Sequence, residues 1–378
     1  MKKILFITTR NPYSGRFSGD VLRSSRIIKL LRAKFNVDIV FLDEKDSKFS
    51  NNKGFKSPNL FLKIIYCLLS LIKLQPIQFG LFYSSKFKKY VQKHANNYDL
   101  LFFHQIRSVQ YFPSNFNGKA ILEMGDIYSD NYKQTYNHLK IINPIYYFYF
   151  IESFLVRRLE KKSFNLFKRI VLFSKTEIIK IEKKFKSKIA HIPESINNIN
   201  KIFKYSNKNK KIIFIGNLNY LPNKLACENF IKNIFPKLIK IFPEIEFHII
   251  GNKGKFNKYS LSKSPKIIFL GQKKKIDNHI KGSICGLGNL QIATGVQGKV
   301  LTYMSFGLPA VCSERSAVNF GSNVLTYKTE KKLINHIVSL KEEEKISQNY
   351  SSKSLKFIKK YLWKNVSKDY IKLIKDSL

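Results

Sequence analysis

Short apolar runs alternate with longer stretches of helical periodicity in the first half of the chain. In the longer stretches an apolar residue recurs every three or four positions, as it does along one face of a helix. Strands that alternate with helices pair in parallel and build a layered α/β sheet. The pattern predicts strands at residues 4–9, 37–42, 100–103, 120–123 and 170–173, and helices at residues 21–34, 60–74, 84–96 and 151–167.

The same alternation restarts after a polar segment rich in Asn and Ser at residues 194–210, which is typical of a connection between domains. Beyond it the pattern predicts strands at residues 212–216, 246–251, 267–271, 284–287 and 309–312, and helices at residues 225–241, 297–306 and 352–378. We therefore predict two Rossmann-like, doubly wound domains facing a cleft, where such sheets bind ligands. The predicted divisions are an N-terminal domain (1–195), a linker (196–210), a second domain (211–355) and a C-terminal helix (356–378).

Composition favours a globular protein with anionic partners. The chain has 378 residues, of which 44% are hydrophobic, and this share is enough for two cores. Its 68 Lys and Arg against 25 Asp and Glu give a formal net charge of +43. This charge attracts nucleic acid, acidic lipid or phosphorylated substrates, although an AT-rich genome also enriches Lys, Asn and Ile. Because the basic residues are spread along the chain and no nucleic-acid-binding motif is present, nucleic acid is the less favoured partner.

The cysteines and the apolar runs bear on the compartment. Cys67, Cys227, Cys285 and Cys312 are too far apart for a zinc or redox motif, which favours a reducing compartment. The run at residues 4–9 is too short for a signal peptide, and no run reaches 18 apolar residues. We therefore expect a cytoplasmic protein, soluble or peripheral on the inner face of the membrane.

One predicted helix, at residues 60–74, has an apolar stripe bordered by lysines. Leu60, Ile64 and Leu68 share a helical face, and Lys63 and Lys73 lie within the same stretch. An amphipathic helix of this kind can lie in the headgroup region of an anionic bilayer. The alternative is that the stripe packs on the N-terminal sheet and that the lysines are merely solvated. The sequence leaves both open.

Two strand–glycine–helix junctions are candidate phosphate sites. The first, residues 14–20, reads Ser-Gly-Arg-Phe-Ser-Gly-Asp before a predicted helix. Glycine lets the backbone approach a phosphate, and a helix N-terminus offers N–H groups to it. The spacing matches neither the Rossmann fingerprint nor the P-loop, and Asp20 also fits a helix cap. The spacing alone therefore does not separate a phosphate contact from an ordinary helix start.

The second junction, at residues 293–311, is more specific. A loop of small residues opens a helix, Gly307 ends it, and Pro309 leads into a strand. Lys299 lies in the first helical turn, where a cation opposes the helix dipole unless an anion also binds there. The placement of Lys299 therefore predicts a bound phosphate.

These motifs make the chain similar to the nucleotide-sugar glycosyltransferases of the GT-B fold, in particular glycosyltransferase family 4. The family pattern K-hydrophobic-L-E-A-M-A-x-G-x-P-V-V corresponds to Lys-Val-Leu-Thr-Tyr-Met-Ser-Phe-Gly-Leu-Pro-Ala-Val at residues 299–311. Residues 213–223 resemble the start of the family's donor domain, and residues 19–23, 98–99 and 152–160 resemble its acceptor half. The resemblance covers most of the chain and implies a C-terminal helix that crosses back to the N-terminal domain.

The resemblance implies transfer of a sugar from a nucleoside diphosphate sugar to a glycan or lipid-linked acceptor, with retention at the anomeric carbon, in surface polysaccharide or glycoconjugate synthesis. Lys299 and backbone N–H groups would stabilise the departing diphosphate, so no cofactor or metal ion is expected. The seven histidines show no spacing of metal ligands. The expected partners are the nucleotide sugar, the acceptor and an anionic membrane surface.

The resemblance also assigns site residues. Lys299 and Gly19 are expected at the diphosphate and Thr302 at the ribose. The full donor set is Gly19, Gly216, Asn217, Thr294, Gly295, Val296, Gln297, Lys299 and Thr302. The expected catalytic residues are Asp126 and His104, and the acceptor side is assigned Asp20, Arg107 and Ser129.

Some of these residues have a second interpretation. His104 fits a core position as well as a ligand contact. Glu123 and Asp126 form either a carboxylate pair or an ordinary loop at a strand end. The aromatic run at residues 146–150 is expected in the core or along an acceptor groove.

Three positions depart from the family pattern. Thr294 and Thr302 stand where family 4 has two glutamates, and Asn217 stands where an arginine is common. A hydroxyl brings no charge to the ribose contact, so donor binding should weaken by about 1–2 kcal/mol. The alternatives are therefore a catalytically impaired nucleotide-sugar binder and a same-fold epimerase, although the threonines do not supply the carboxylate pair that proton abstraction needs.

Overall fold

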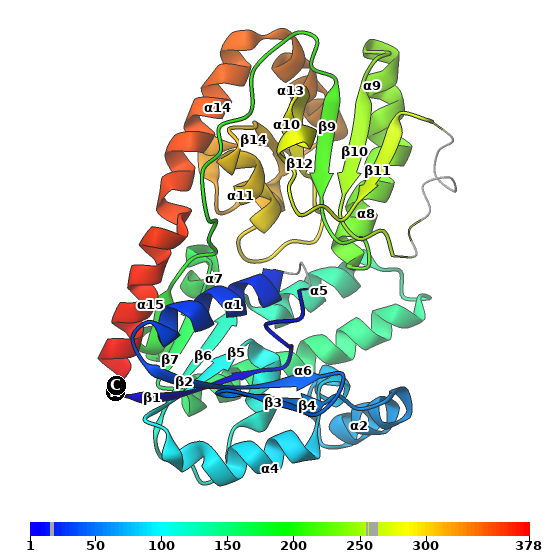
Figure 1. The fold of residues 1–378 in the computed structure, drawn as a ribbon. Helices are drawn as coiled ribbons and strands as arrows, with labels where there is room; N and C mark the ends of the chain where they lie inside the picture. Colours follow the sequence, from blue (N-terminus) through cyan, green and yellow to red (C-terminus); the bar gives the residue numbers. More distant parts are fainter. Residues whose placement is uncertain (16–18, 255, 257–263) are drawn as a thin grey trace. The chain divides into compact units, whose positions relative to one another are not determined.

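Two parallel sheets organise the chain (Figure 1). The computed structural model describes residues 1–15, 19–254, 256 and 264–378. Unit 1 comprises residues 1–193 and 367–378, and unit 2 comprises residues 194–366. Helices lie on both faces of each sheet. The predicted α/β fold with two doubly wound domains is therefore confirmed.

The sheet of unit 1 consists of β1 (Lys3–Thr8), β2 (Asn36–Asp43), β3 (Ser47–Phe49), β4 (Asn52–Lys56), β5 (Leu100–His104), β6 (Lys119–Gly125), β7 (Arg169–Leu172) and β8 (Ile189–His191). Their order across the sheet is β3-β4-β2-β1-β5-β6-β7-β8. All neighbours are parallel except β3 and β4, which pair antiparallel at the edge. The central strands β1 and β5 are nearly continuous apolar runs, as expected where helices cover both faces.

The helices of unit 1 are α1 (Gly19–Arg32), α2 (Leu60–Ile72), α3 (Gln78–Leu81), α4 (Ser85–His94), α5 (Tyr128–His138), α6 (Pro144–Leu166) and α7 (Lys175–Ile179). Helix α6 begins earlier than its apolar periodicity predicts. The side chain of Asn143 caps it by accepting from the backbone N–H of Ile145 at 3.0 Å, and Pro144 suits the first turn because it has no N–H to lose.

Unit 2 repeats the architecture with β9 (Lys211–Ile215), β10 (Glu246–Ile250), β11 (Ile267–Gly271), β12 (Ser283–Gly288), β13 (Ala310–Ser313) and β14 (Leu325–Tyr327), in the order β11-β10-β9-β12-β13-β14. Its helices are α8 (Leu221–Asn229), α9 (Phe235–Ile241), α10 (Asp277–Ile280), α11 (Gly298–Ser305), α12 (Glu314–Ala317), α13 (Glu330–Glu342) and α14 (Glu344–Ile358). A π-helical turn at Phe230–Ile234 interrupts the helix predicted at residues 225–241, just before Pro236.

Residues 194–210, which the sequence suggests as a linker, belong to unit 2. The backbone N–H groups of Ile202 and Phe203 donate to the carbonyl of Phe306 at 3.2 and 3.1 Å. Ile196 pairs with Leu362 and accepts from the backbone N–H of Trp363 at 2.8 Å. This pairing holds an extended residue between α14 and the last helix, α15 (Trp363–Ser377). The single helix predicted at residues 352–378 is therefore two helices.

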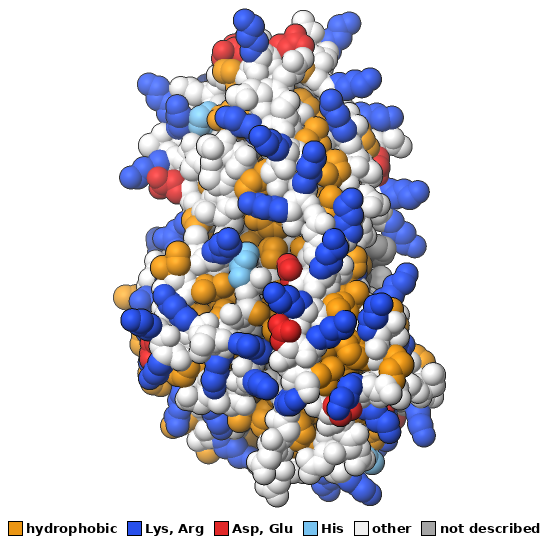
Figure 2. Space-filling view, turned by 90° about the vertical axis from the view of Figure 1, so that its left-hand side faces the viewer, with side chains coloured by type: hydrophobic (Ala, Val, Ile, Leu, Met, Phe, Trp, Pro, Cys, Tyr) orange, Lys and Arg blue, Asp and Glu red, His pale blue; other side chains and the backbone are white. Residues whose placement is uncertain are grey.

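From Ser367 onward, α15 packs in unit 1, as the resemblance implied. The space-filling view in Figure 2 shows Lys and Arg side chains scattered over the face it displays, with few Asp and Glu among them. Among the described residues, no helix combines the length and the hydropathy that crossing a bilayer requires.

Candidate functional site

Each sheet has a point where the chain reverses its direction of winding. In unit 2 the chain runs from β9 to β10 and β11 on one side, and then returns to β12 on the other side of β9. Doubly wound sheets bind ligands at the carboxyl ends of the strands that flank such a switch point. The segments there are Gly216–Tyr220, after β9, and the loop of residues 289–297, after β12.

The turn after β9 is closely packed. A Cβ on Gly216 would lie 2.9 Å from the side chain of Asn223, and a Cβ on Gly251 would lie 2.0 Å from the carbonyl oxygen of Gly216. Asn223 Nδ2 donates to the carbonyl of Asn217 at 3.0 Å. The side chain of Asn217 is exposed and accepts from the backbone N–H of Asn219 at 2.9 Å. Asn217 therefore orders its own turn, where the family often has an arginine.

The loop before α11 is held by its backbone. Gly295 adopts φ 64°, a left-handed conformation that favours glycine. Asn319 Nδ2 donates to the carbonyl of Gly295 at 2.6 Å, and Gln297 Nε2 donates to the carbonyl of Thr294 at 2.8 Å. The side chain of Gln297, the N-cap residue, does not bond to the first turn of α11. The loop therefore presents the N-terminus of α11 without a side-chain cap.

Lys299, in the first turn of α11, contacts residues on either side of the turn after β9. Its ammonium donates to Asn223 Oδ1 at 2.7 Å and lies 3.9 Å from the centre of the Phe214 ring. Burial of this ammonium lowers the pKa of Lys299 from 10.5 to about 7. Lys299 is therefore close to losing its proton at neutral pH. A bound anion would raise the pKa of Lys299 again and so favour its charged form.

Thr302, expected at the ribose, lies one turn further along α11. Its hydroxyl donates to the carbonyl of Gly298 at 2.9 Å, and its side chain is partly exposed. A hydroxyl that donates to its own helix still has lone pairs that can accept a bond from a ligand.

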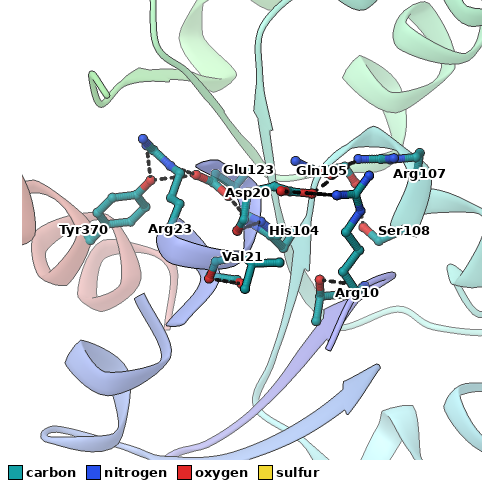
Figure 3. A network of polar contacts seen from close by, with 12 residues as sticks. Arg10, Asp20, Val21, Arg23, His104, Gln105, Arg107, Ser108, Glu123 and Tyr370 are labelled. Atoms are coloured by element: carbon teal, nitrogen blue, oxygen red, sulfur yellow. Dashed lines mark hydrogen bonds and ion pairs between the residues drawn. The ribbon is translucent and has the colours of Figure 1, made fainter. Parts of the chain in front are cut away.

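Unit 1 has its own switch point between β1 and β5. Asp20, in the first turn of α1, lies there between two arginines (Figure 3). Its Oδ2 is 3.1 Å from Arg10 Nη1 and 3.7 Å from Arg107 Nη2. Between β5 and Arg107, Gln105 adopts φ 67°, which is unusual for a residue other than glycine and marks a constrained turn. Of the first glycine junction, residues 16–18 lie outside the described residues.

His104 belongs to a buried polar network on the other side of Asp20 (Figure 3). Its Nδ1 bonds to Glu123, and its Nε2 lies 3.1 Å from the carbonyl oxygen of Asp20. Glu123 also accepts from Arg23 Nε and, at 2.9 Å, from the hydroxyl of Tyr370. Since both ring nitrogens of His104 are bonded within unit 1, this geometry favours its structural interpretation over a direct ligand contact.

The network fixes the charge of Glu123. Burial alone would raise the pKa of this carboxyl, but the charges of His104 and Arg23, with their hydrogen bonds, lower it to about 2. Tyr370 comes from α15 and also accepts from Arg23 Nη2 at 2.6 Å. The network therefore ties the C-terminal helix to α1, which begins at the first glycine junction.

The other two expected residues, Asp126 and Ser129, follow β6 and have different surroundings. Asp126 is partly buried beside Tyr128, whose pKa is raised by burial and by the nearby Asp126 and Asp20 charges. Ser129 is buried, and its N–H and hydroxyl donate to the two carboxylate oxygens of Glu160 at 3.0 and 2.5 Å. Ser129 thus holds Glu160, which gives Ser129 a structural role in this loop.

Several residues at the two switch points were not expected from the sequence. Arg10 follows β1, and its position at the end of an apolar strand is the signal that could have identified it. Asn223 lies inside the family-like stretch 213–223. Arg23 and Tyr370 are 347 residues apart, so no local pattern joins them. No group of three His, Cys, Asp or Glu that could hold a metal ion occurs within the part of the chain that the structure describes.

Comparison with known protein families gives a match within unit 2. Residues 209–343 match the sequence model of the family described as glycosyl transferases group 1. This range contains Gly216, Asn223 and Lys299. A search of curated proteins gave no match.

Solved structures resemble the chain over nearly its whole length. HepE of Anabaena, in complex with UDP and glucose, has a TM-score of 0.67 at 13% identity, with 100% of this chain and 99% of HepE covered. S. aureus TarM, in a complex that includes UDP, has a TM-score of 0.65 at 9% identity, with 99% of both chains covered. The lipopolysaccharide outer core galactosyltransferase WaaB has a TM-score of 0.56 at 14% identity, with both chains fully covered. Because the sequence identities are so low, these similarities establish the fold alone.

Proposed function

We propose that the chain, whose residues 209–343 match the group 1 glycosyl transferases and whose fold is that of GT-B glycosyltransferases, transfers a sugar from a nucleoside diphosphate sugar to a glycan or lipid-linked acceptor. The expected product class is a surface polysaccharide or glycoconjugate, since the neighbour WaaB is a lipopolysaccharide outer core galactosyltransferase. UDP is the nucleotide to test first, because HepE and TarM were solved with UDP.

The observation that carries this proposal is the position of Lys299 at the switch point of unit 2. Its ammonium lies beside Asn223 after β9, in the first turn of a helix whose N-terminus lacks a side-chain cap. The N-terminus of a helix and a lysine together form an anion site. The diphosphate of a donor would supply an anion for this site.

The proposed chemistry is electrostatic. As the bond between the sugar and the diphosphate breaks, negative charge grows on the diphosphate, and Lys299 with the N–H groups of α11 stabilises it. Gly295, Val296 and Gln297 shape the loop around the phosphates, and the backbone of Gly19 would add N–H groups. The acceptor hydroxyl forms its bond to the anomeric carbon on the face that the diphosphate leaves, and its proton passes to the departing diphosphate, so the anomeric configuration is retained. We expect no cofactor or metal ion to take part.

We assign the sugar and acceptor side to unit 1. Asp126 is the proposed catalytic carboxylate that faces the sugar, and Arg107 and Asp20 the proposed acceptor contacts. The ion pairs of Asp20 with Arg10 and Arg107 support a polar, charged edge suited to hydroxyl groups. We also propose that the protein works on the inner surface of the membrane, where a lipid-linked acceptor would lie.

The test is release of the nucleoside diphosphate from a panel of nucleotide sugars, measured with and without membrane extracts that contain acceptor lipids. We expect one donor to raise the melting temperature and to be consumed faster when acceptor is present. Asp126→Asn should abolish consumption while the donor still binds. Lys237→Ala, which changes an exposed lysine of α9, should behave as wild type. Donor binding without consumption would favour the catalytically impaired binder, and no binding of any donor would contradict the proposal.

A further inference from the structure

Helix α2 leaves most of its apolar side chains exposed. Of its 13 residues only Ser70 is buried, although nearly all the others are hydrophobic. Leu60, Phe61 and Ile72 are 76%, 71% and 76% exposed, and Ile64 and Leu68 are more than half exposed. The stripe at residues 60–74 therefore does not pack on the N-terminal sheet, which removes the alternative that the sequence left open.

The first half of α6 shows the same property. Ile142, just before the helix, is 89% exposed, and Phe154 is 67% exposed. The aromatic run at residues 146–150, expected in the core or along an acceptor groove, has three exposed rings, those of Tyr147, Phe148 and Phe150. Most of the exposed large hydrophobic side chains among the described residues belong to residues 60–74 and 141–154.

The two stretches meet at α3. Gly80 of α3 lies against the backbone of α2, where an added Cβ would be 2.2 Å from the N atom of Cys67. The N–H groups of Ile77 and Gln78 donate to the carboxylate of Glu152, on α6, at 2.7 and 3.2 Å. In Figure 1, α2 and the start of α6 lie at the same right-hand edge of unit 1. They form one apolar surface, which we call the α2/α6 surface, made of residues 60–74 and 141–154.

The charged residues in the two stretches and next to them in the sequence are lysines, with one exception. Lys56, Lys63, Lys73 and Lys140 lie in or beside it. Glu152 is the one acidic residue in the two stretches, and it is buried against α3. Apolar side chains with a rim of lysines match the two layers of an anionic bilayer surface, its acyl boundary and its headgroups.

We infer that the α2/α6 surface inserts into the headgroup region of an anionic lipid membrane. The biological role of this insertion rests on the proposed function, because it would place unit 1 beside a lipid-linked acceptor. The structural observations behind the inference do not depend on that function. Insertion of such helices reaches about 5–10 Å, to the boundary of the acyl chains.

A second copy of the chain fits this surface less well. In a twofold dimer the same patch contacts itself, so the lysine rims of both copies would come together. Like charges at such distance repel, and the one acidic side chain of the two stretches, Glu152, is buried and does not offset them. Lipid headgroups provide the opposite charge.

The experiment is co-sedimentation of the full chain with vesicles of phosphatidylglycerol or of phosphatidylcholine, at low and raised salt. The test variant changes four of the most exposed side chains to serine: Phe61→Ser, Ile72→Ser, Ile142→Ser and Phe154→Ser. The matched control is Ile179→Ser, because Ile179 is 71% exposed in unit 1 but lies in α7. Since all five side chains face water, each variant should keep its melting temperature.

We expect wild type and Ile179→Ser to bind the anionic vesicles at least tenfold more tightly than the fourfold variant does, and raised salt to weaken this binding. Equal binding by all three proteins, no preference for anionic lipid, or no binding would overturn the inference. A concentration-dependent dimer that the fourfold variant loses, measured by sedimentation without lipid, would also overturn it in favour of a second copy. The affinity for a nucleoside diphosphate should be the same in all three proteins. This second measurement tests the proposed donor site independently of membrane binding.

Discussion

At the scale of single residues, Lys299 has an unusual environment for a lysine side chain. Burial against Phe214 lowers its pKa to about 7, so it is charged below that pH and increasingly neutral above it. A bound diphosphate prefers the charged form, which means that binding takes up a proton above pH 7. Donor affinity is therefore linked to pH through this one side chain.

We predict that the affinity for a UDP-sugar falls as pH rises above 7, by up to about tenfold per pH unit, because one proton must be bound with the ligand. Calorimetric titration between pH 6 and 9 measures this slope. Lys299→Gln has no proton to take up, so its affinity should be lower but independent of pH. An equal slope in wild type and variant would assign the titration to another group.

Thr302 offers a second test on the same helix. Thr302→Glu places a carboxylate where the ribose hydroxyls are expected, and should tighten nucleotide binding by about 1–2 kcal/mol. The partial exposure of Thr302 leaves room for the longer side chain. Binding is measured by calorimetry and stability by thermal melting. A lower melting temperature without a gain in affinity would show that the position packs against the protein and does not face the nucleotide.

At the scale of elements, the buried network of Arg23, Glu123, His104 and Tyr370 ties α15 to α1, β5 and β6. Its charges are paired with one another, so the loss of one partner leaves others unsatisfied in a buried site. Removing one partner of a buried hydrogen bond costs more stability than the bond itself contributes, because the remaining group cannot bond to water instead.

We predict that Tyr370→Phe loosens α15. The change removes a hydroxyl that accepts from Arg23 at 2.6 Å and donates to Glu123 at 2.9 Å. The free energy of opening of α15, measured by amide hydrogen exchange, should fall by about 1–3 kcal/mol. Lys372→Ala, an exposed change on the same helix, should leave the exchange of α15 as in wild type. If both variants exchange like wild type, the network does not hold the helix.

Glu160 connects α6 to the first turn of α5, and burial raises its pKa to about 7. A raised carboxyl pKa means that the folded protein holds a proton that the unfolded chain has already lost above about pH 4.5. The contribution of Glu160 to stability is therefore largest at low pH and declines as pH rises from about 4.5 to 7.

In wild type, the ionisation of Glu160 should lower the free energy of unfolding by about 3 kcal/mol over that pH range. We predict that Glu160→Gln lacks this decrease, because glutamine cannot ionise. Denaturant unfolding of wild type and variant at pH 5 and pH 7.5 makes the comparison. The difference between the two proteins should change with pH in that direction. A constant difference would mean that Glu160 does not titrate there.

At the scale of the whole molecule, the parallel strands were the most predictable part. Buried runs such as β1 and β5 are apolar along nearly their whole length, and helices separate them, so local pattern and fold agree. The edge hairpin of β3 and β4 was not predicted, since its partly exposed residues lack a strong pattern. The break before α15 depends on the pairing of Ile196 with Leu362, which no window of neighbouring residues contains.

The candidate site was predictable only as far as its motifs reach. Lys299 was placed correctly in the first turn of its helix, but its contact with Asn223 depends on packing between β9, α8 and α11. Ser129 and His104 have polar side chains at strand ends, which the sequence suggests as ligand contacts. In the fold, Glu160 and Glu123 occupy them. A polar side chain at a strand end can bind a ligand or hold the fold together, and only the tertiary contacts show which of the two it does.

The central claim is that the switch point of unit 2 binds the diphosphate of a sugar donor. The most direct measurement is a calorimetric titration of the full chain with UDP at pH 6.5, in wild type, Lys299→Ala and Lys237→Ala. The account predicts that wild type and Lys237→Ala bind alike, and that Lys299→Ala binds about tenfold more weakly or worse, because a charge-assisted contact contributes about 1.5–3 kcal/mol. Equal affinities in all three proteins, with an intact fold in Lys299→Ala, would contradict it.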